Sequence, residues 1–202
     1  MKTGSASITR TCKDCGLSLT TAVSVVDPGV TLNRTKTLTL ARGMTYQLKA
    51  YNKKAVFNGL SANEWSKLDY TWTSSATKYA KVSSKGKITA KAKGTTYIYA
   101  KDPISKSYAR LKVIVVDPLA KMRRGTTVVA GKTLTLKKGK TVKLNVRLTP
   151  NVSTTKTWTT SNKSVATVTS AGVVKGIKVG YTYIYCTLAS GRKTWVRIRV
   201  IK

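Results

Sequence analysis

The sequence predicts an all-β protein made of two tandem β-sandwiches preceded by a short N-terminal arm. Three observations lead to this prediction. A long segment occurs twice, apolar residues alternate with polar ones over short runs, and glycine turns recur about every 8 to 12 residues. No sustained helical period interrupts this pattern.

The internal repeat establishes two folding units. Identical or nearly identical segments follow one another in the same order in both halves, so each half should bury a core of its own. We expect an arm at 1–29, a first domain at 30–117 and a second at 118–202. The matching segments are Lys36–Leu40 with Lys132–Leu136, Thr71–Thr73 with Thr157–Thr159, and Gly94–Tyr99 with Gly180–Tyr185.

The arm is expected to contribute one extra strand. Val25-Val26-Asp27-Pro28 resembles the segment Val115–Pro118, where the proline ends ladder bonding and closes the first repeat. Residues 19–26 are therefore predicted to form a strand that pairs with the first sandwich or with a neighbouring subunit.

The two copies differ in length at one place. Trp72 follows Lys36 by 36 residues, whereas Trp158 follows Lys132 by 26. The additional residues fall at about 51–68, where Ser61 and Glu64 have capping-box spacing. We interpret this insertion as a surface loop, and a binding loop is the alternative.

Catalytic and metal-binding residues are scarce. The chain has no histidine, and its six acidic residues are scattered. Three cysteines cannot all pair internally, and Cys12 and Cys15 form half of a zinc knuckle at most. We predict no enzyme activity, no cofactor and no metal site; a disulfide, free thiols or a site shared between subunits stay open for the cysteines.

The ordered motifs resemble the bacterial immunoglobulin-like domain, group 2, over about residues 30–202. They include a Leu-Thr-Leu strand, a glycine turn, a Trp-Thr-Ser or Trp-Thr-Thr segment and a final Gly-x-Thr-Tyr-Ile strand. The resemblance implies two Ig-like sandwiches that serve as spacers or binding modules without catalysis. Such domains occur in intimin- and invasin-type adhesins and in bacteriophage tail and capsid proteins. The first copy has Leu38–Leu40, Gly43, Trp72–Ser75 and Gly94–Ile98; the second has Leu134–Leu136, Gly139, Trp158–Ser161 and Gly180–Ile184.

The tryptophans divide into two kinds. Trp72 and Trp158 are expected to pack in the cores, where a sandwich accommodates a large ring. Trp195 falls on the polar phase of its strand and is predicted to face outward. It is a candidate anchor for a partner, or an edge or interdomain contact.

The charge balance points to an anionic partner. The chain has 38 Lys and Arg against 6 Asp and Glu, a net charge of +32, and no acidic residue follows Asp117. A solubilising coat is the alternative. The candidate polyanion-binding residues should coat both faces of the second sandwich, which favours non-specific attraction over base-specific recognition. These residues are Arg123, Arg124, Lys137, Lys138, Lys140, Lys143, Arg147, Arg197 and Arg199.

The resulting hypothesis is a non-enzymatic structural or adhesive module in a larger assembly. Residues 1–17 contain no apolar leader segment, and no stretch is long and apolar enough to span a membrane, which favours a virion decoration protein of a capsid or tail. A fragment of a bacterial cell-surface adhesin that binds wall polymer or host cells is the second hypothesis. A protein that binds nucleic acid non-specifically is the third.

Overall fold

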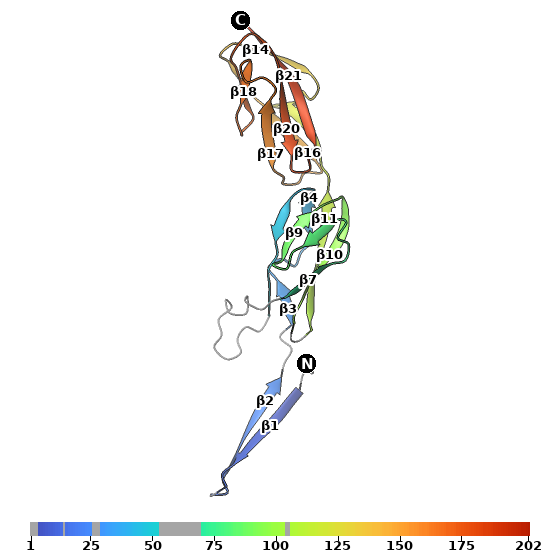
Figure 1. Cartoon of the computed structure of the whole chain (residues 1–202), viewed down its shortest axis with the longest axis vertical. Coiled ribbons are helices and arrows are strands. Elements are labelled where there is room, and N and C mark those ends of the chain that lie inside the picture. The colour runs from blue at the N-terminus through green and yellow to red at the C-terminus, as the bar shows by residue number, and fades with distance from the viewer. Residues whose placement is uncertain (1–3, 14, 26–28, 53–69, 104–105) are drawn as a thin grey trace.

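A computed structural model describes residues 4–13, 15–25, 29–52, 70–103 and 106–202. Every regular element in these ranges is a β-strand (Figure 1). The all-β prediction is therefore confirmed. The insertion predicted at about 51–68, with its capping-box residues, falls almost wholly outside the described residues.

The part of the chain predicted to form the first sandwich, residues 30–117, is called domain 1 here, and its described strands form two layers. Its four-stranded sheet has the order β4-β11-β10-β7, in which β4 runs parallel to β11 and the other pairs are antiparallel. The facing layer consists of β3 with β6, and of β9 between β5 and β8. The strands are β3 (Val30–Leu32), β4 (Leu38–Ala41), β5 (Thr45–Gln47), β6 (Ala50–Asn52), β7 (Thr71–Ser74), β8 (Ala80–Val82), β9 (Lys87–Ala90), β10 (Gly94–Lys101) and β11 (Tyr108–Val116).

The part of the chain predicted to form the second sandwich, residues 118–202, is called domain 2 here, and it repeats this arrangement. Its four-stranded sheet has the order β14-β21-β20-β17, again with one parallel pair at the β14 edge. The facing layer consists of β13-β12-β16 and β15-β19-β18. The strands are β12 (Leu119–Arg124), β13 (Thr127–Val128), β14 (Thr133–Lys137), β15 (Thr141–Lys143), β16 (Asn145–Thr149), β17 (Lys156–Thr160), β18 (Ala166–Val168), β19 (Val173–Gly176), β20 (Gly180–Leu188) and β21 (Lys193–Ile201).

Each domain has a separate hydrophobic core. Strands β10 and β20 contribute the corresponding residues Ile98 and Ile184, both fully buried. Strand β21 alternates exposed and buried residues along most of its length, as its sequence predicts. Trp72 and Trp158 pack against these cores but stay half-buried, and each indole lies close to a turn glycine, Gly86 or Gly172.

A buried threonine fixes the same turn in each domain. The Thr182 hydroxyl is 2.9 Å from Thr160 Oγ1 and accepts a hydrogen bond from the Asn162 amide at 3.0 Å. In domain 1, Thr96 has the same role toward Ser74 and toward the Ala76 amide. The repeated Gly-x-Thr motif therefore ties the turn after β7 or β17 to the neighbouring central strand.

Replacement of this hydroxyl should be costly. We expect Thr182→Val to lower the free energy of unfolding of domain 2 by about 1–3 kcal/mol, because the shape is kept while buried partners lose a hydrogen bond. Denaturant unfolding of the full chain measures this change. Thr187→Val, a half-buried threonine on the same strand, is the control, and equal losses for both variants would contradict the role of the buried hydroxyl.

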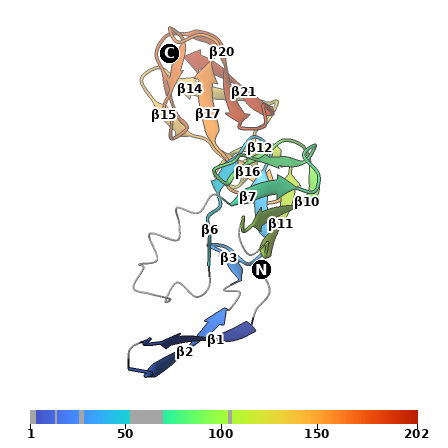
Figure 2. The same ribbon diagram turned by 60° about the horizontal axis from the view of Figure 1, so that its bottom comes forward.

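The arm differs from its sequence prediction. The expected strand forms as β2 (Ser18–Val25), but it pairs with β1 (Gly4–Thr11) in an antiparallel hairpin and not with the first sandwich. The Cys12 amide donates to the Leu17 carbonyl at 2.8 Å and closes the turn. Local pairing closes a short loop, which costs less conformational entropy than pairing with a distant strand. In Figure 1 and Figure 2 the hairpin stands apart from both sandwiches.

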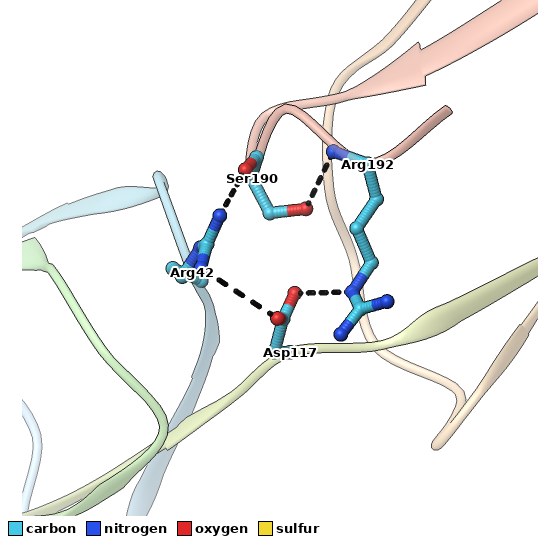
Figure 3. Close-up of polar contacts among 4 residues, drawn as sticks. All are labelled: Arg42, Asp117, Ser190 and Arg192. Atoms are coloured by element: carbon cyan, nitrogen blue, oxygen red, sulfur yellow. Dashed lines mark hydrogen bonds and ion pairs between the residues drawn. The ribbon is translucent and has the colours of Figure 1, made fainter.

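The two sandwiches meet end to end at a polar junction (Figure 1, Figure 3). Asp117 lies between β11 and β12, with Arg42 of domain 1 at 3.7 Å and Arg192 of domain 2 at 3.0 Å. Arg42 also donates to the Ser190 carbonyl at 2.5 Å. Asp117 therefore links both domains, while Pro118 separates the last strand of one from the first strand of the next.

The junction should depend on the charge of Asp117. The hydrogen bond from Arg192 lowers the pKa of Asp117, and the positive charges of Arg192 and Arg42 add to this effect. Asp117 therefore contributes its full stabilisation of the folded junction at pH values above about 3.9, the pKa of an Asp in the unfolded chain. This stabilisation is lost as the pH falls through the lower pKa that Asp117 has in the folded protein.

We expect Asp117→Asn to widen the distribution of interdomain orientations at neutral pH. Small-angle X-ray scattering and residual dipolar couplings of the two domains measure this distribution. The wild-type chain at a pH below the folded pKa of Asp117 should resemble the variant. An interdomain distribution that the substitution leaves unchanged would show that the ion pairs do not hold the joint.

Candidate cationic binding surface

The predicted cationic residues lie on different layers of domain 2. Arg197 and Arg199 project from β21 on the exposed face of the four-stranded sheet, and Lys137 follows on the edge strand β14. The Arg197 Nε group donates to Thr133 Oγ1 at 2.8 Å, which ties this guanidinium to β14. Lys138 and Lys140 are exposed in the turn between β14 and β15.

The remaining candidates belong to the opposite layer. Lys143 is exposed on β15, and Arg147 is exposed on β16 opposite Lys121. Arg123 and Arg124 end β12, the first half-buried and the second exposed. The structure thus distributes the candidates over both faces, as the sequence analysis expects, and does not gather them in one groove. Their role in binding stays a prediction.

Among the described residues, the exposed arginines of β21 form no ion pair. Domain 2 contains no acidic residue, and both ion pairs of the described residues involve Asp117 at the junction. Arg197 and Arg199 instead approach the ring of Tyr181, with Cζ 5.4 and 5.9 Å from its centroid. The ring holds the guanidiniums in place without neutralising them.

Trp195 faces outward, as the alternation of apolar and polar residues along its strand predicts. It is 39% exposed and makes an edge-to-face contact with Tyr183 at 5.5 Å between ring centroids. Its role as a partner anchor stays a prediction.

A set of outward tyrosines, not predicted from the sequence, lies on the exposed faces of the four-stranded sheets. Their signal was present in the repeat, because Tyr-Ile-Tyr occurs in both copies and the buried isoleucine turns its two neighbours outward. In domain 1 the same face bears Arg110, whose Cζ is 5.4 Å from the Tyr97 centroid. The outward tyrosines are Tyr97, Tyr99 and Tyr108 in domain 1, and Tyr181, Tyr183 and Tyr185 in domain 2.

Metal ligands do not cluster in the part of the chain that the structure describes. No group of three or more His, Cys, Asp or Glu side chains converges there. Cys12 and Cys15 are exposed at the hairpin turn, whereas Cys186 is buried in the core, where desolvation raises the pKa of its thiol to about 11. Among the same residues, no helix has the length and apolarity of a membrane span.

Comparison with known families assigns the repeats. The family model of the bacterial Ig-like domain (group 2) matches residues 20–113 and 126–198. The chain belongs to this family. The resemblance seen in the sequence and the prediction of two tandem Ig-like sandwiches are both confirmed. Membership of this family supports a non-enzymatic structural or adhesive module.

Solved structures similar to this bacterial Ig-like chain include an S-layer protein and a fragment of intimin. The crystal structure of the S-layer protein SbsC is 16% identical, with 98% of this chain and 35% of that chain covered and a TM-score of 0.36. A C-terminal fragment of intimin, in complex with the intimin-binding domain of its receptor Tir, is 18% identical, with 84% and 62% covered and a TM-score of 0.36. At these identities and TM-scores the likeness says nothing about the function of this chain.

One curated relative is an enzyme. The 3-O-alpha-D-galactosyl-alpha-L-arabinofuranosidase of Bifidobacterium longum subsp. longum is 48% identical over 54 residues, which are 26% of this chain and 5% of that protein. The chain therefore spans about a twentieth of this relative and about a third of the S-layer chain. The shared segment is shorter than one of the two Ig-like domains.

Proposed function

We propose that this bacterial Ig-like chain is a structural and adhesive module that presents a cationic surface to an anionic assembly or polymer. The observation that carries the proposal is the absence of any acidic residue after Asp117, which leaves the exposed cations of domain 2 without a carboxylate in their own domain. Such an excess of charge destabilises a fold unless salt or a partner offsets it. Family membership supports a non-catalytic role.

The setting that we propose is a virion, with the chain decorating a capsid or tail. The hairpin supports docking at one end, because Ile8, Leu17 and Leu19 are 62–74% exposed there. The end-to-end sandwiches then project away from the docking site, and the C-terminus lies at the far end (Figure 1). A bacterial cell surface would use the same geometry and is the alternative setting.

Deletion of residues 1–26 tests the docking. We expect the truncated chain to keep both folded sandwiches, because their cores contain no residue of the hairpin, and to be lost from the particle fraction of its source. Circular dichroism checks folding, and fractionation of particles and cell envelopes measures location. Recovery in envelopes would support the cell-surface setting, and undiminished incorporation into particles would contradict docking by the hairpin.

Binding to a simple polyanion tests the cationic surface. We expect the full chain to bind immobilised polyglutamate at low ionic strength and to pass over neutral dextran, because the partner is recognised by charge. Retention on each matrix is the measurement. Single-stranded DNA that is retained far more strongly than polyglutamate would favour the nucleic-acid hypothesis, and no retention on any polyanion would refute the proposed function.

A further inference from the structure

The exposed face of the four-stranded sheet in domain 1 contains a hollow of about 390 Å³. Its volume falls within the range of about 300–1,000 Å³ that is usual for small-molecule sites. It lies over β7, β10 and the start of β11, on the side opposite the core. The hollow is lined by Thr71, Thr73, Tyr99, Lys101, Lys106 and Tyr108.

The polar part of the lining supplies two kinds of group. Thr71 and Thr73 are exposed and supply hydroxyl groups, which donate and accept hydrogen bonds. Lys101 and Lys106 are exposed and supply ammonium groups. Asp102, which follows Lys101 in the chain, is 2% exposed and does not line the hollow. The hollow is therefore polar, hydrogen-bonding and cationic.

Two tyrosines form an aromatic corner in this hollow. The ring centroids of Tyr99 and Tyr108 are 5.9 Å apart, and their planes meet at 59°. Tyr108 is 64% exposed, so its ring is accessible to a ligand. A tilted pair of rings suits a puckered sugar ring, which has C–H groups for the rings and hydroxyls for the threonines.

Base stacking fits this face less well. A nucleobase needs a flat, open ring face. Tyr97, the next outward tyrosine on β10, has its ring covered by the Arg110 guanidinium at 5.4 Å. Arg110 itself is exposed, so it extends the positive charge along β11 away from the hollow. The face thus offers exposed cations and one tilted pair of rings, and it has no row of open ring faces on which successive bases could stack.

We propose that this hollow binds a sugar unit of an acidic polysaccharide, with the ring against Tyr99 and Tyr108 and its carboxylate on Lys101 and Lys106. The exposed cations of β11 contact further carboxylates along the same polymer. This proposal rests on the proposed function, which supplies an anionic partner, and adds that the partner is a carboxylate-bearing glycan.

The test compares polymers that differ in one property. Polygalacturonate carries a carboxylate on each sugar, its methyl ester keeps the sugar without the charge, and polyglutamate keeps the charge without the sugar. We expect the full chain to bind polygalacturonate most tightly, in calorimetric titrations at one low ionic strength. Equal binding of polyglutamate would overturn the glycan assignment while leaving the proposed function in place, whereas no binding of either polyanion would refute both.

Variants locate the site. Tyr108→Ala should weaken polygalacturonate binding about tenfold, whereas Tyr51→Ala, an exposed tyrosine on the facing layer, should leave it within about twofold. Lys101→Gln should weaken it more than Lys87→Gln, an exposed lysine on β9. Equal losses of polygalacturonate affinity in the two tyrosine variants, or in the two lysine variants, would overturn this location. Tighter binding of single-stranded DNA, with the same dependence on Tyr108, would replace the glycan by nucleic acid.

Discussion

Ile184→Ala is expected to lower the free energy of unfolding of domain 2 by about 2–5 kcal/mol, while domain 1 keeps its stability. Ile184 is fully buried in the core of domain 2, and truncation leaves a cavity among close-packed side chains. Ile98→Ala, at the same position of the repeat, should have the same effect on domain 1 alone. The size follows from the lost apolar contacts and the cavity that remains.

Hydrogen exchange of the full chain, followed by mass spectrometry, separates the two domains. Peptides from β20 and β21 should lose protection in Ile184→Ala, and peptides from β10 and β11 should lose it in Ile98→Ala. Leu119→Ala, at a side chain that is 53% exposed, is a control that should change protection little. Loss of protection in both domains from one core substitution would contradict two independent cores.

Gly43→Ala is expected to open the junction, because an added Cβ would lie 2.2 Å from the Ala189 carbonyl oxygen of domain 2. The Ala189 oxygen is a backbone atom of domain 2, so it can move away only if domain 2 moves with it. Arg42 should then lose its contacts with Asp117 and Ser190. Gly43 also has φ +84°, a conformation that costs a side chain about 1–2 kcal/mol. Both domains should stay folded while their relative orientation is released.

Gly139 provides a matched control in the same turn of domain 2. It has φ +79°, and nothing lies within 4 Å of an added Cβ. Gly139→Ala should therefore destabilise domain 2 through its backbone conformation alone and leave the relative orientation of the two domains unchanged. Residual dipolar couplings and small-angle scattering measure the interdomain distribution of both variants. Equal distributions for the two would show that the Gly43–Ala189 contact does not set the joint.

The two sandwiches could be predicted from the sequence. The repeat marks two folding units, and the alternation of apolar and polar residues indicates which side chains of each strand are buried. Strand β21 shows this, since Val196, Ile198 and Val200 alternate with polar residues and all three are buried. The pairing of β2 with β1 was not predicted. Its composition indicates a strand, but the choice of partner depends on how short the intervening turn is.

The junction and the aromatic faces required the structure. Arg42, Asp117 and Arg192 are far apart in the sequence, and no local pattern connects them. The hollow around Tyr99 and Tyr108 depends on register, because β10 and β11 must be aligned before the two rings meet. The sequence showed that cations were abundant, but not which of them would lie beside aromatic rings.

The dependence of polyanion affinity on salt tests the central claim most directly. A chain that binds through its exposed cations releases counterions from the polymer. The association constant should fall steeply between about 50 and 200 mM salt, with a slope that grows with the number of ionic contacts. Titration of the full chain with polygalacturonate across this range gives the slope. An affinity that does not change with salt, or no measurable binding at the lowest salt concentration, would contradict a cationic adhesive surface.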